Sequence, residues 1–364
     1  MGEERTGEKD LASEIVEEIR QVAARIGRPV GLMEVCGTHT VELRRQGIHS
    51  LLPESIRLIS GPGCPVCVTP AGYIDNAIEL ARSGRALVAS FGDMLKVPGS
   101  TGATLASLSG RGLVKMIYSP AQLVGLAAAS AKPVVFLAIG FETTIPTVLS
   151  ALLAARDRGI DNLFLSTAFK RVVPALRSLL ARKGAAVDAF LLPGHVSAII
   201  GSDAYAFLSE PGGLPGVVTG FEPLDMLLGI LLALRQVSAG THEVRNAYPR
   251  AVRPGGNEKA LRLMAETLEP RSDLWRGLGR IEGGSLGLRS DLSRFDAEVR
   301  FSLPVPVDSE TPSCLCAKVI AGEADPLQCA LFASRCTPED PVGPCMVSTE
   351  GTCAAWLRYG QARP

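Results

Sequence analysis

The chain has 364 residues with 37 basic and 37 acidic side chains, so its formal net charge at pH 7 is zero. This balance gives no support to a nucleic-acid-binding protein, which needs a clustered basic surface. The length predicts two or three domains, and 38 glycines with 25 prolines are typical of an α/β protein with many tight turns.

The chain begins with residues 1–10, which carry both signs of charge and no apolar core, so they do not resemble a signal peptide. Apolar residues at helical spacing over 11–26 then predict an N-terminal helix, which completes the segment 1–27. The most apolar stretch, residues 227–234, is too short to span a membrane and is expected to be a buried helix. We therefore expect a soluble, cytoplasmic protein without a membrane partner.

The segment 28–128 is predicted to be a first α/β domain. One strand leads into Cys36, and a second leads into a turn that holds Cys64 and Cys67, fixed by glycine and proline. The expected strands are 29–35, 57–60 and 86–91, the expected helices are 41–46, 72–83 and 119–129, and 94–112 is expected to be a loop.

The pattern then restarts, which predicts a second, similar α/β domain over 129–240. Three matches support the repeat: 132–144 resembles 28–40, 190–195 resembles 58–64, and 217–227 resembles 87–95. The alternative is that strands of α/β proteins resemble one another without any repeat. Residues 241–364 differ in composition, because they are first Arg- and Gly-rich and then Cys-rich. We assign them to a third, less regular domain.

The nine cysteines fall into two groups, separated by more than two hundred residues without cysteine. Three lie in the first fifth of the chain, and six lie in the last fifty-odd residues: Cys314, Cys316, Cys329, Cys336, Cys345 and Cys353. Structural disulfides are not expected in a reducing cytosol. Two groups therefore predict two separate tasks.

The first group has the residue types of thiol chemistry. A thiol at the N-terminus of a helix has a lowered pKa, so Cys36 is predicted to be a thiolate, with His39 as a cation, proton carrier or ligand beside it. Cys64 and Cys67 form a C-x-x-C pair that suits thiol–disulfide exchange. Two alternatives stay open: an inert buried Cys36, or a zinc ion held by the pair with Cys36 and His39.

The second group is the strongest metal signal. Four thiolates are the usual ligand set of an iron–sulfur cluster, and we predict the set Cys329, Cys336, Cys345 and Cys353. Cys314 and Cys316 are then spare, and Cys316 could replace one of the four. Zinc, which also accepts four cysteines, is the alternative.

Two residues of the second half, Glu142 and His195, follow predicted strands and are further candidates for the site. Ligands of parallel sheets gather at the carboxyl ends of strands, so Cys36, Cys64, Gly140 and His195 are expected to face one another across a cleft between the halves. As lone residues, Glu142 and His195 could equally be capping or core groups. Neither a Walker loop nor a G-x-G-x-x-G motif is present, so no nucleotide site is supported.

Five motifs in order resemble the HypD family of [NiFe]-hydrogenase maturation factors. They are M-E-V-C-G-T-H-T (33–40), G-P-G-C-P-V-C-V (61–68), G-F-E-T-T-x-P (140–146), P-G-H-V-S-x-I-I-G (193–201) and C-T-P-x-x-P-V-G-P-C-M-V-S-T-E-G-T-C-A-A (336–355). Small departures are Ala333, where glycine is expected, and Trp356, where a tyrosine-like ring is expected.

The resemblance implies two similar α/β domains and a C-terminal domain with a [4Fe-4S] cluster on Cys329, Cys336, Cys345 and Cys353. It implies a scaffold that, with a small HypC-type chaperone, binds iron and assembles the Fe(CN)₂CO unit, with cyanide delivered by a HypE-type partner. Cys36 would be the iron ligand with His39 beside it, and Cys64 and Cys67 the thiol/disulfide pair. The alternative is a free-standing iron–sulfur-dependent thiol–disulfide reductase.

Overall fold

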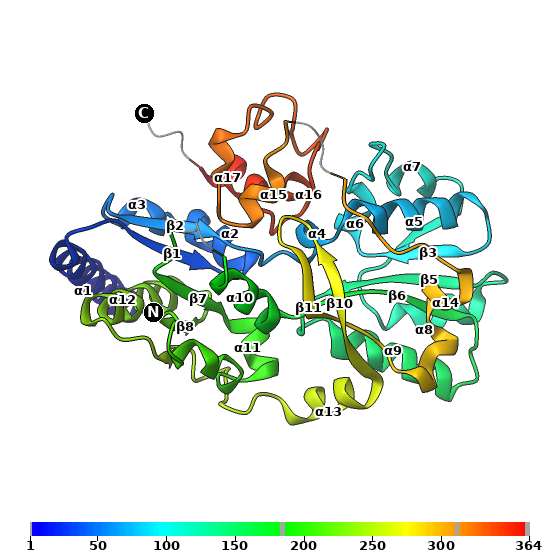
Figure 1. Cartoon of the computed structure of the whole chain (residues 1–364), viewed down its shortest axis with the longest axis horizontal. Helices are drawn as coiled ribbons and strands as arrows, with labels where there is room; N and C mark the ends of the chain where they lie inside the picture. The colour runs from blue at the N-terminus through cyan, green and yellow to red at the C-terminus, as the bar shows by residue number, and fades with distance from the viewer. Residues whose placement is uncertain (1, 183–185, 310–312, 361–364) are drawn as a thin grey trace.

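Two β-sheets form the framework of the computed structural model, which describes residues 2–182, 186–309 and 313–360. The sheets lie side by side, and the C-terminal segment covers the place where they meet (Figure 1). Residues 310–312 and 361–364 of the expected third domain lie outside the described residues. The expected α/β class, with two mostly parallel sheets and a Cys-rich C-terminal region, is confirmed.

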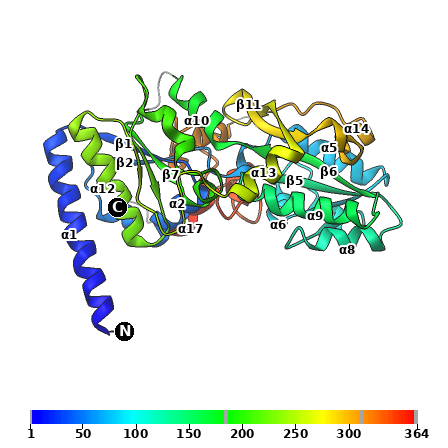
Figure 2. The same cartoon turned by 90° about the horizontal axis from the view of Figure 1, so that it is seen from below.

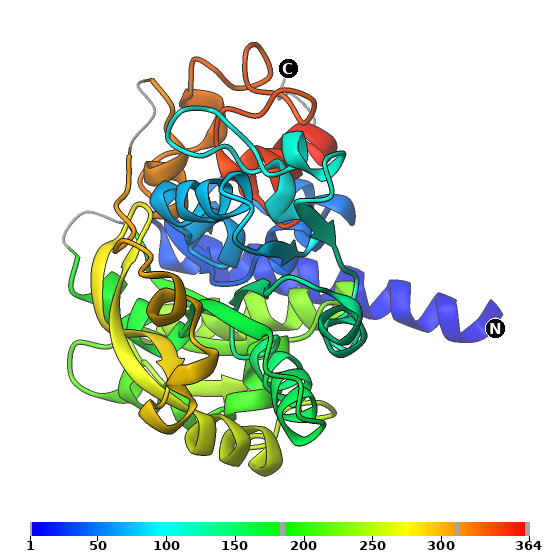
Figure 3. The ribbon, with the colours of Figure 1, turned by 90° about the vertical axis from the view of Figure 1, so that its right-hand side faces the viewer.

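The first sheet consists of parallel strands in the order β2 (Ile56–Ser60), β1 (Val30–Glu34), β7 (Ala189–Pro193), β8 (Gly216–Thr219) and β9 (Val244–Asn246). All residues of β1, β7 and β8 are buried, because both faces of a parallel sheet are covered. Helix α12 (Pro223–Ala239) packs on β7 and β8, and α1 (Gly2–Ile26) packs on α12. The buried helix expected at 227–234 is part of α12, and the start of α1 extends past the rest of the chain (Figures 2 and 3).

The second sheet has the order β10 (Leu268–Trp275), β11 (Gly279–Leu288), β6 (Leu163–Lys170), β5 (Val134–Gly140), β3 (Leu87–Ser90) and β4 (Val114–Met116). The four strands from β6 to β4 are parallel, whereas β10 and β11 form an antiparallel hairpin at the edge. The residues of β10 do not alternate regularly between buried and exposed positions, so the sequence pattern did not predict the hairpin. The hairpin joins the segment after residue 241 to the second sheet.

The two expected halves exchange strands. Strand β1 pairs with β7, and β3 pairs with β5, so each sheet takes strands from both sides of residue 128. The match of 217–227 with 87–95 fits this arrangement, since β8 and β3 each lie next to an edge strand of their sheet. The match of 190–195 with 58–64 does not fit it, because β2 is an edge strand while β7 is central. The division at 128/129 therefore does not coincide with the division into sheets.

The helices expected at 41–46, 72–83 and 119–129 are present, and the loop expected at 94–112 contains two short helices. Apart from α1 and α12, the helices are α2 (Gly37–Arg45), α3 (Ile48–Leu51), α4 (Pro65–Val68), α5 (Ala71–Arg82), α6 (Gly92–Lys96), α7 (Ala106–Ser109), α8 (Gln122–Ala129), α9 (Ile145–Asp157), α10 (Val172–Leu180), α11 (Gly194–Ile200), η1 (Asp203–Ser209), α13 (Glu258–Thr267), η2 (Ser290–Phe295), α14 (Ala297–Phe301), α15 (Cys316–Ile320), η3 (Pro326–Gln328), α16 (Pro344–Val347) and α17 (Thr352–Tyr359).

Polar and aromatic contacts hold the C-terminal segment over the junction of the two sheets. The guanidinium of Arg44 in α2 lies 3.6 Å from the ring centroid of Trp356 in α17. The carboxylate of Asp93 accepts hydrogen bonds from the backbone N–H of Thr349 (3.1 Å) and the hydroxyl of Ser348 (3.3 Å). These contacts place the tail next to the strand ends. Within the described parts of the chain, no helix combines the length and the apolar character needed to cross a membrane.

Candidate functional site

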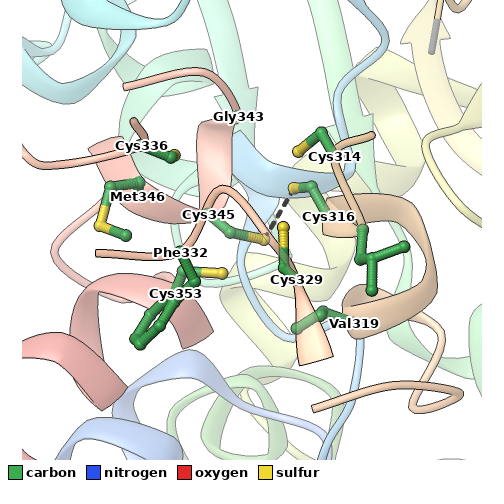
Figure 4. A pocket seen from close by; sticks show the side chains of 11 residues that line it. Cys314, Cys316, Val319, Cys329, Phe332, Cys336, Gly343, Cys345, Met346 and Cys353 are labelled. Carbon is green, nitrogen blue, oxygen red and sulfur yellow. Dashed lines mark hydrogen bonds between the residues drawn. The ribbon is translucent and has the colours of Figure 1, made fainter. Parts of the chain in front are cut away.

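The six cysteines of the tail gather around one cavity. In Figure 4 their side chains approach one another from separate segments: α15 and the turn before it, the end of η3, the loop after it, α16 and α17. The sulfur atoms of Cys316 and Cys345 are 3.0 Å apart. All four predicted cluster ligands line this cavity, and so do Cys314 and Cys316.

Glycine at position 343 leaves room in this cavity for the cysteine side chains. A Cβ added at Gly343 would lie 3.1 Å from the sulfur of Cys314, so a side chain there would crowd the cavity. Thiol hydrogen bonds from Cys314 and Cys345, with the charge of Arg276, lower the pKa of Cys316. Within residues 2–182, 186–309 and 313–360, no three Cys, His, Asp or Glu side chains are placed so that they could hold a metal ion. The sulfur-rich lining nevertheless fits the soft ligand set that an iron–sulfur cluster requires.

Cys64 and Cys67 form a disulfide across the short helix α4, with their Cα atoms 5.3 Å apart. In this state neither sulfur is a thiolate, so the pair offers no ligand to zinc. A second cavity is lined by both members of the disulfide and by Cys345. The sulfur of Cys67 lies 3.9 Å from the carbonyl oxygen of Pro344, the residue before Cys345. The disulfide therefore adjoins the cysteine cavity of the tail.

Cys36 lies between the end of β1 and the start of α2, as predicted, and lines a third cavity of about 140 Å³. The polar groups of Thr38 and the backbone N–H of His39, in the first turn of α2, favour the thiolate, although the thiol forms no capping hydrogen bond. Burial outweighs them and, with the charge of Glu350, raises the pKa of Cys36 to about 11. The predicted lowering of this pKa is wrong, because only 9% of the residue is exposed to water.

The loops of Cys36 and of the disulfide touch directly. The backbone N–H of Gly37 donates to the carbonyl of Gly63 (3.2 Å). A Cβ added at Gly63 would lie 2.4, 2.5 and 2.6 Å from the Cα, N and C atoms of Cys36. Glycine at position 63 therefore allows Cys36 and Cys64 to share one site.

The third cavity lies where the two sheets meet. Its walls come from the ends of β1, β5 and β7, from the turn before α4 and from the tail. His195, at the start of α11, lines this cavity beside Thr143 and Thr144. The expected meeting of Cys36 and His195 across a cleft is thus observed, and Cys64 lies between two residues that line it, Gly63 and Pro65.

His39 and Glu142 do not line this cavity. The imidazole of His39 is fully buried, and its Nε2 lies 3.0 Å from the carbonyl oxygen of Gly220 and 2.9 Å from the hydroxyl of Thr219. Burial lowers the pKa of His39 to about 4, so the ring is neutral at pH 7. The ring of Phe221 stacks between His39 (centroids 4.7 Å apart) and His195 (3.9 Å).

Glu142 has the geometry of a capping residue. One oxygen of its carboxyl group accepts the backbone N–H of Val172 at the start of α10 (3.0 Å), and the other is buried without a partner among the described residues. Burial raises the pKa of Glu142 to about 7. The hydrogen bonds of Glu142 therefore favour the alternative prediction, that it is a capping residue.

Glu350 is a site residue that sequence reasoning missed. It lines both the disulfide cavity and the Cys36 cavity, and its carboxylate accepts a hydrogen bond from the Thr38 hydroxyl (2.7 Å). Burial raises its pKa. Its only signal in the sequence is its position between Cys345 and Cys353, inside the fifth motif.

The three cavities adjoin one another in succession. Cys345 borders the tail cavity and the disulfide cavity, and Glu350 borders the disulfide cavity and the Cys36 cavity. Such an order places a buried thiol, a disulfide and a sulfur-rich cavity in succession, and these are the residue types of soft-metal binding and thiol–disulfide exchange.

Comparisons with known proteins agree with the resemblance seen in the motifs. The family model HypD, described as "Hydrogenase formation hypA family", matches residues 10–360. The hydrogenase maturation factor HypD of Azotobacter vinelandii is 43% identical over 358 residues, which is 94% of each chain. The protein of the same name from Escherichia coli is 41% identical over 355 residues, covering 96% of this chain and 95% of the relative.

Proposed function

The chain belongs to the HypD family of hydrogenase maturation factors, and we propose that it is the scaffold on which the Fe(CN)₂CO unit of [NiFe]-hydrogenase is assembled, together with a small HypC-type chaperone. The observation that carries the proposal is the succession of three adjoining cavities from the tail cysteines to Cys36. A scaffold that binds iron and receives electrons needs these sites in succession. As a cargo-handling factor of maturation, it would work in the cytoplasm.

Cys36 would bind the iron cargo through its sulfur. With a pKa of about 11 it is a neutral thiol at pH 7, so iron binding must release its proton. His195 and Glu350 line the same cavity and are the candidates to accept that proton. A cysteine of the HypC-type chaperone would complete the iron ligands from the open side of the cavity. His39 would act only by holding the start of α2, since its ring is bonded elsewhere.

The tail cavity would hold a [4Fe-4S] cluster on Cys329, Cys336, Cys345 and Cys353. Bound there, the cluster would supply single electrons. Cys345 also borders the cavity of the Cys64–Cys67 disulfide, so electrons would pass to that pair over the shortest route that the fold offers. Reduction is needed when cyanide groups from a HypE-type donor are released onto the iron.

The direct test is Cys36→Ala, purified anaerobically with the small chaperone. We expect this variant to lose bound iron and its cyanide and CO infrared bands, while keeping the acid-labile sulfide of the tail cluster. Cys345→Ala serves as the reciprocal variant, which should lose the sulfide. Unchanged infrared bands in Cys36→Ala would refute the assignment of the iron ligand.

A free-standing thiol–disulfide reductase is the second candidate, favoured by the disulfide that lies next to the tail cavity. A wild-type complex that carries the cluster and reduces protein disulfides, but shows no cyanide or CO absorption, would support the reductase. Zinc without sulfide in the purified protein would refute both candidates and indicate a zinc-binding module.

Cys316 competes with the four proposed ligands, because its sulfur lies 3.0 Å from that of Cys345 and its pKa is lowered. Cys316→Ser and Cys329→Ser distinguish the two sets. We expect Cys329→Ser to lose the cluster and Cys316→Ser to keep it; the reverse result would transfer the ligand role to Cys316.

A further inference from the structure

Arg276 is a buried arginine, with 7% of the residue exposed, in the turn between β10 and β11. Its backbone N–H donates to the carbonyl of Val68 (2.8 Å). Its guanidinium donates to the carbonyl of Thr69 through Nη2 (3.3 Å) and Nε (3.4 Å). Both carbonyls belong to the end of the segment that carries the Cys64–Cys67 disulfide. The hairpin turn is therefore fixed against the disulfide segment.

The same turn packs against the tail cavity. Gly277 has φ = +77°, and a Cβ added there would lie 2.3 Å from the carbonyl oxygen of Ala317, the residue after Cys316. Trp275 and Leu278, on either side of Arg276, share one apolar cluster with Cys67, Cys316 and Cys345. A positive charge is thus held against the disulfide segment, in a turn that also packs against the tail, and its field reaches Cys316.

The positive charge of Arg276 is only partly neutralised by a neighbouring carboxylate. The nearest carboxylate is that of Asp308, whose oxygen is 3.6 Å from Nη1 and also accepts the backbone N–H of Ala71 (3.2 Å). This separation is longer than that of a charge-assisted hydrogen bond. A buried cation with such a partner is stabilised further when negative charge appears nearby.

We propose that Arg276 is a positioning residue that raises the reduction potentials of both sulfur sites by stabilising the negative charge of their reduced forms. The inference rests on the proposed cluster and redox-active disulfide. Reduction of the cluster adds one electron from a low-potential one-electron donor. Reduction of the Cys64–Cys67 pair breaks the S–S bond and takes up two electrons and two protons, or leaves thiolates at high pH.

The test uses the anaerobically purified full chain as wild type, Arg276→Gln, Arg276→Lys and Asp308→Asn. Arg280→Gln is the matched control, because Arg280 is an exposed arginine of the same hairpin. The cluster potential is measured by an EPR-monitored titration with dithionite and mediators. The disulfide is equilibrated with dithiothreitol, which becomes a cyclic disulfide as the pair is reduced, and free thiols are alkylated and counted by mass spectrometry.

Arg276→Gln should shift both potentials to more negative values, with a roughly tenfold change in the disulfide equilibrium at pH 9, which is about 30 mV for a two-electron couple. Arg276→Lys should stay close to wild type, since it keeps the charge. Asp308→Asn should shift both potentials in the opposite direction, and Arg280→Gln should leave them unchanged.

Wild-type potentials in a folded Arg276→Gln variant would overturn the inference. If that variant does not fold, Asp308→Asn decides: potentials that fail to rise would overturn it equally. A wild-type protein without acid-labile sulfide would instead refute the proposed cluster, and the dithiothreitol equilibrium alone would then decide the role of Arg276.

Discussion

Gly63→Ala is predicted to separate the two loops that bring Cys36 and the disulfide together. The added Cβ would lie 2.4 Å from the Cα of Cys36, while carbon atoms in contact prefer about 3.5–4.0 Å, so the loops must part by about 1 Å. Overpacking of this kind costs about 1–3 kcal/mol. Loss of the hydrogen bond from Gly37 to Gly63 adds about 1 kcal/mol. We expect the free energy of unfolding to fall by roughly 2–4 kcal/mol.

Urea unfolding measures this loss, and alkylation of Cys36 by iodoacetamide, followed by peptide mass spectrometry, measures the opening of the site. Cys36 should react faster in the variant because the parted loops expose its thiol. Gly110→Ala is the matched control, since Gly110 has φ = −67° and no atom within 4 Å of an added Cβ. That change should be neutral or stabilising by about 1 kcal/mol or less. A Gly63→Ala protein with wild-type stability and wild-type Cys36 reactivity would contradict the steric reasoning.

Three further changes test single features of the chain. Ala333→Gly should stabilise the protein by about 0.5–1 kcal/mol in thermal unfolding, because Ala333 is exposed and has φ = 57°; Ala330→Gly, without a positive φ, should not stabilise. Glu142→Gln should stabilise the protein by up to about 3 kcal/mol at pH 8.5 and should be nearly neutral at pH 4. The reason is that Glu142 has a pKa of about 7 in the folded state, so the wild type loses stability as pH rises from 4.5 through 7. His39→Gln should remove the opposite dependence: with a folded pKa of about 4, the wild type loses stability as pH falls from 6.5 to 4, and denaturation curves at these two pH values reveal it. Parallel pH profiles of wild type and variant would contradict either titration argument.

Local sequence was sufficient for features that depend on neighbours along the chain. The apolar run before Cys36 predicted a buried strand and a helix after it, and both are present as β1 and α2. The C-x-x-C spacing predicted a pair able to close a disulfide, which Cys64 and Cys67 do. Ala333, where the family pattern suggested glycine, does adopt a left-handed backbone. These features follow from side-chain periodicity and backbone sterics within about ten residues.

Electrostatic environment did not follow from the same local rules. A helix does begin after Cys36 as expected, yet the pKa of the thiol rises, because burial and the charge of the distant Glu350 outweigh the helix N-terminus. His39 sits three residues from Cys36, but its ring faces Gly220, a partner that only the pairing of β7 with β8 brings near.

Residue types, motif order and the grouping of cysteines were set by the sequence alone, and with them the α/β class and the family. Tertiary structure alone decided which strands share a sheet, that the tail closes over the junction, and that Glu350 and Arg276 stand between the sulfur sites. The physical reason is range: periodicity and turn sterics act between neighbours, whereas burial and charge act between any segments that packing brings together.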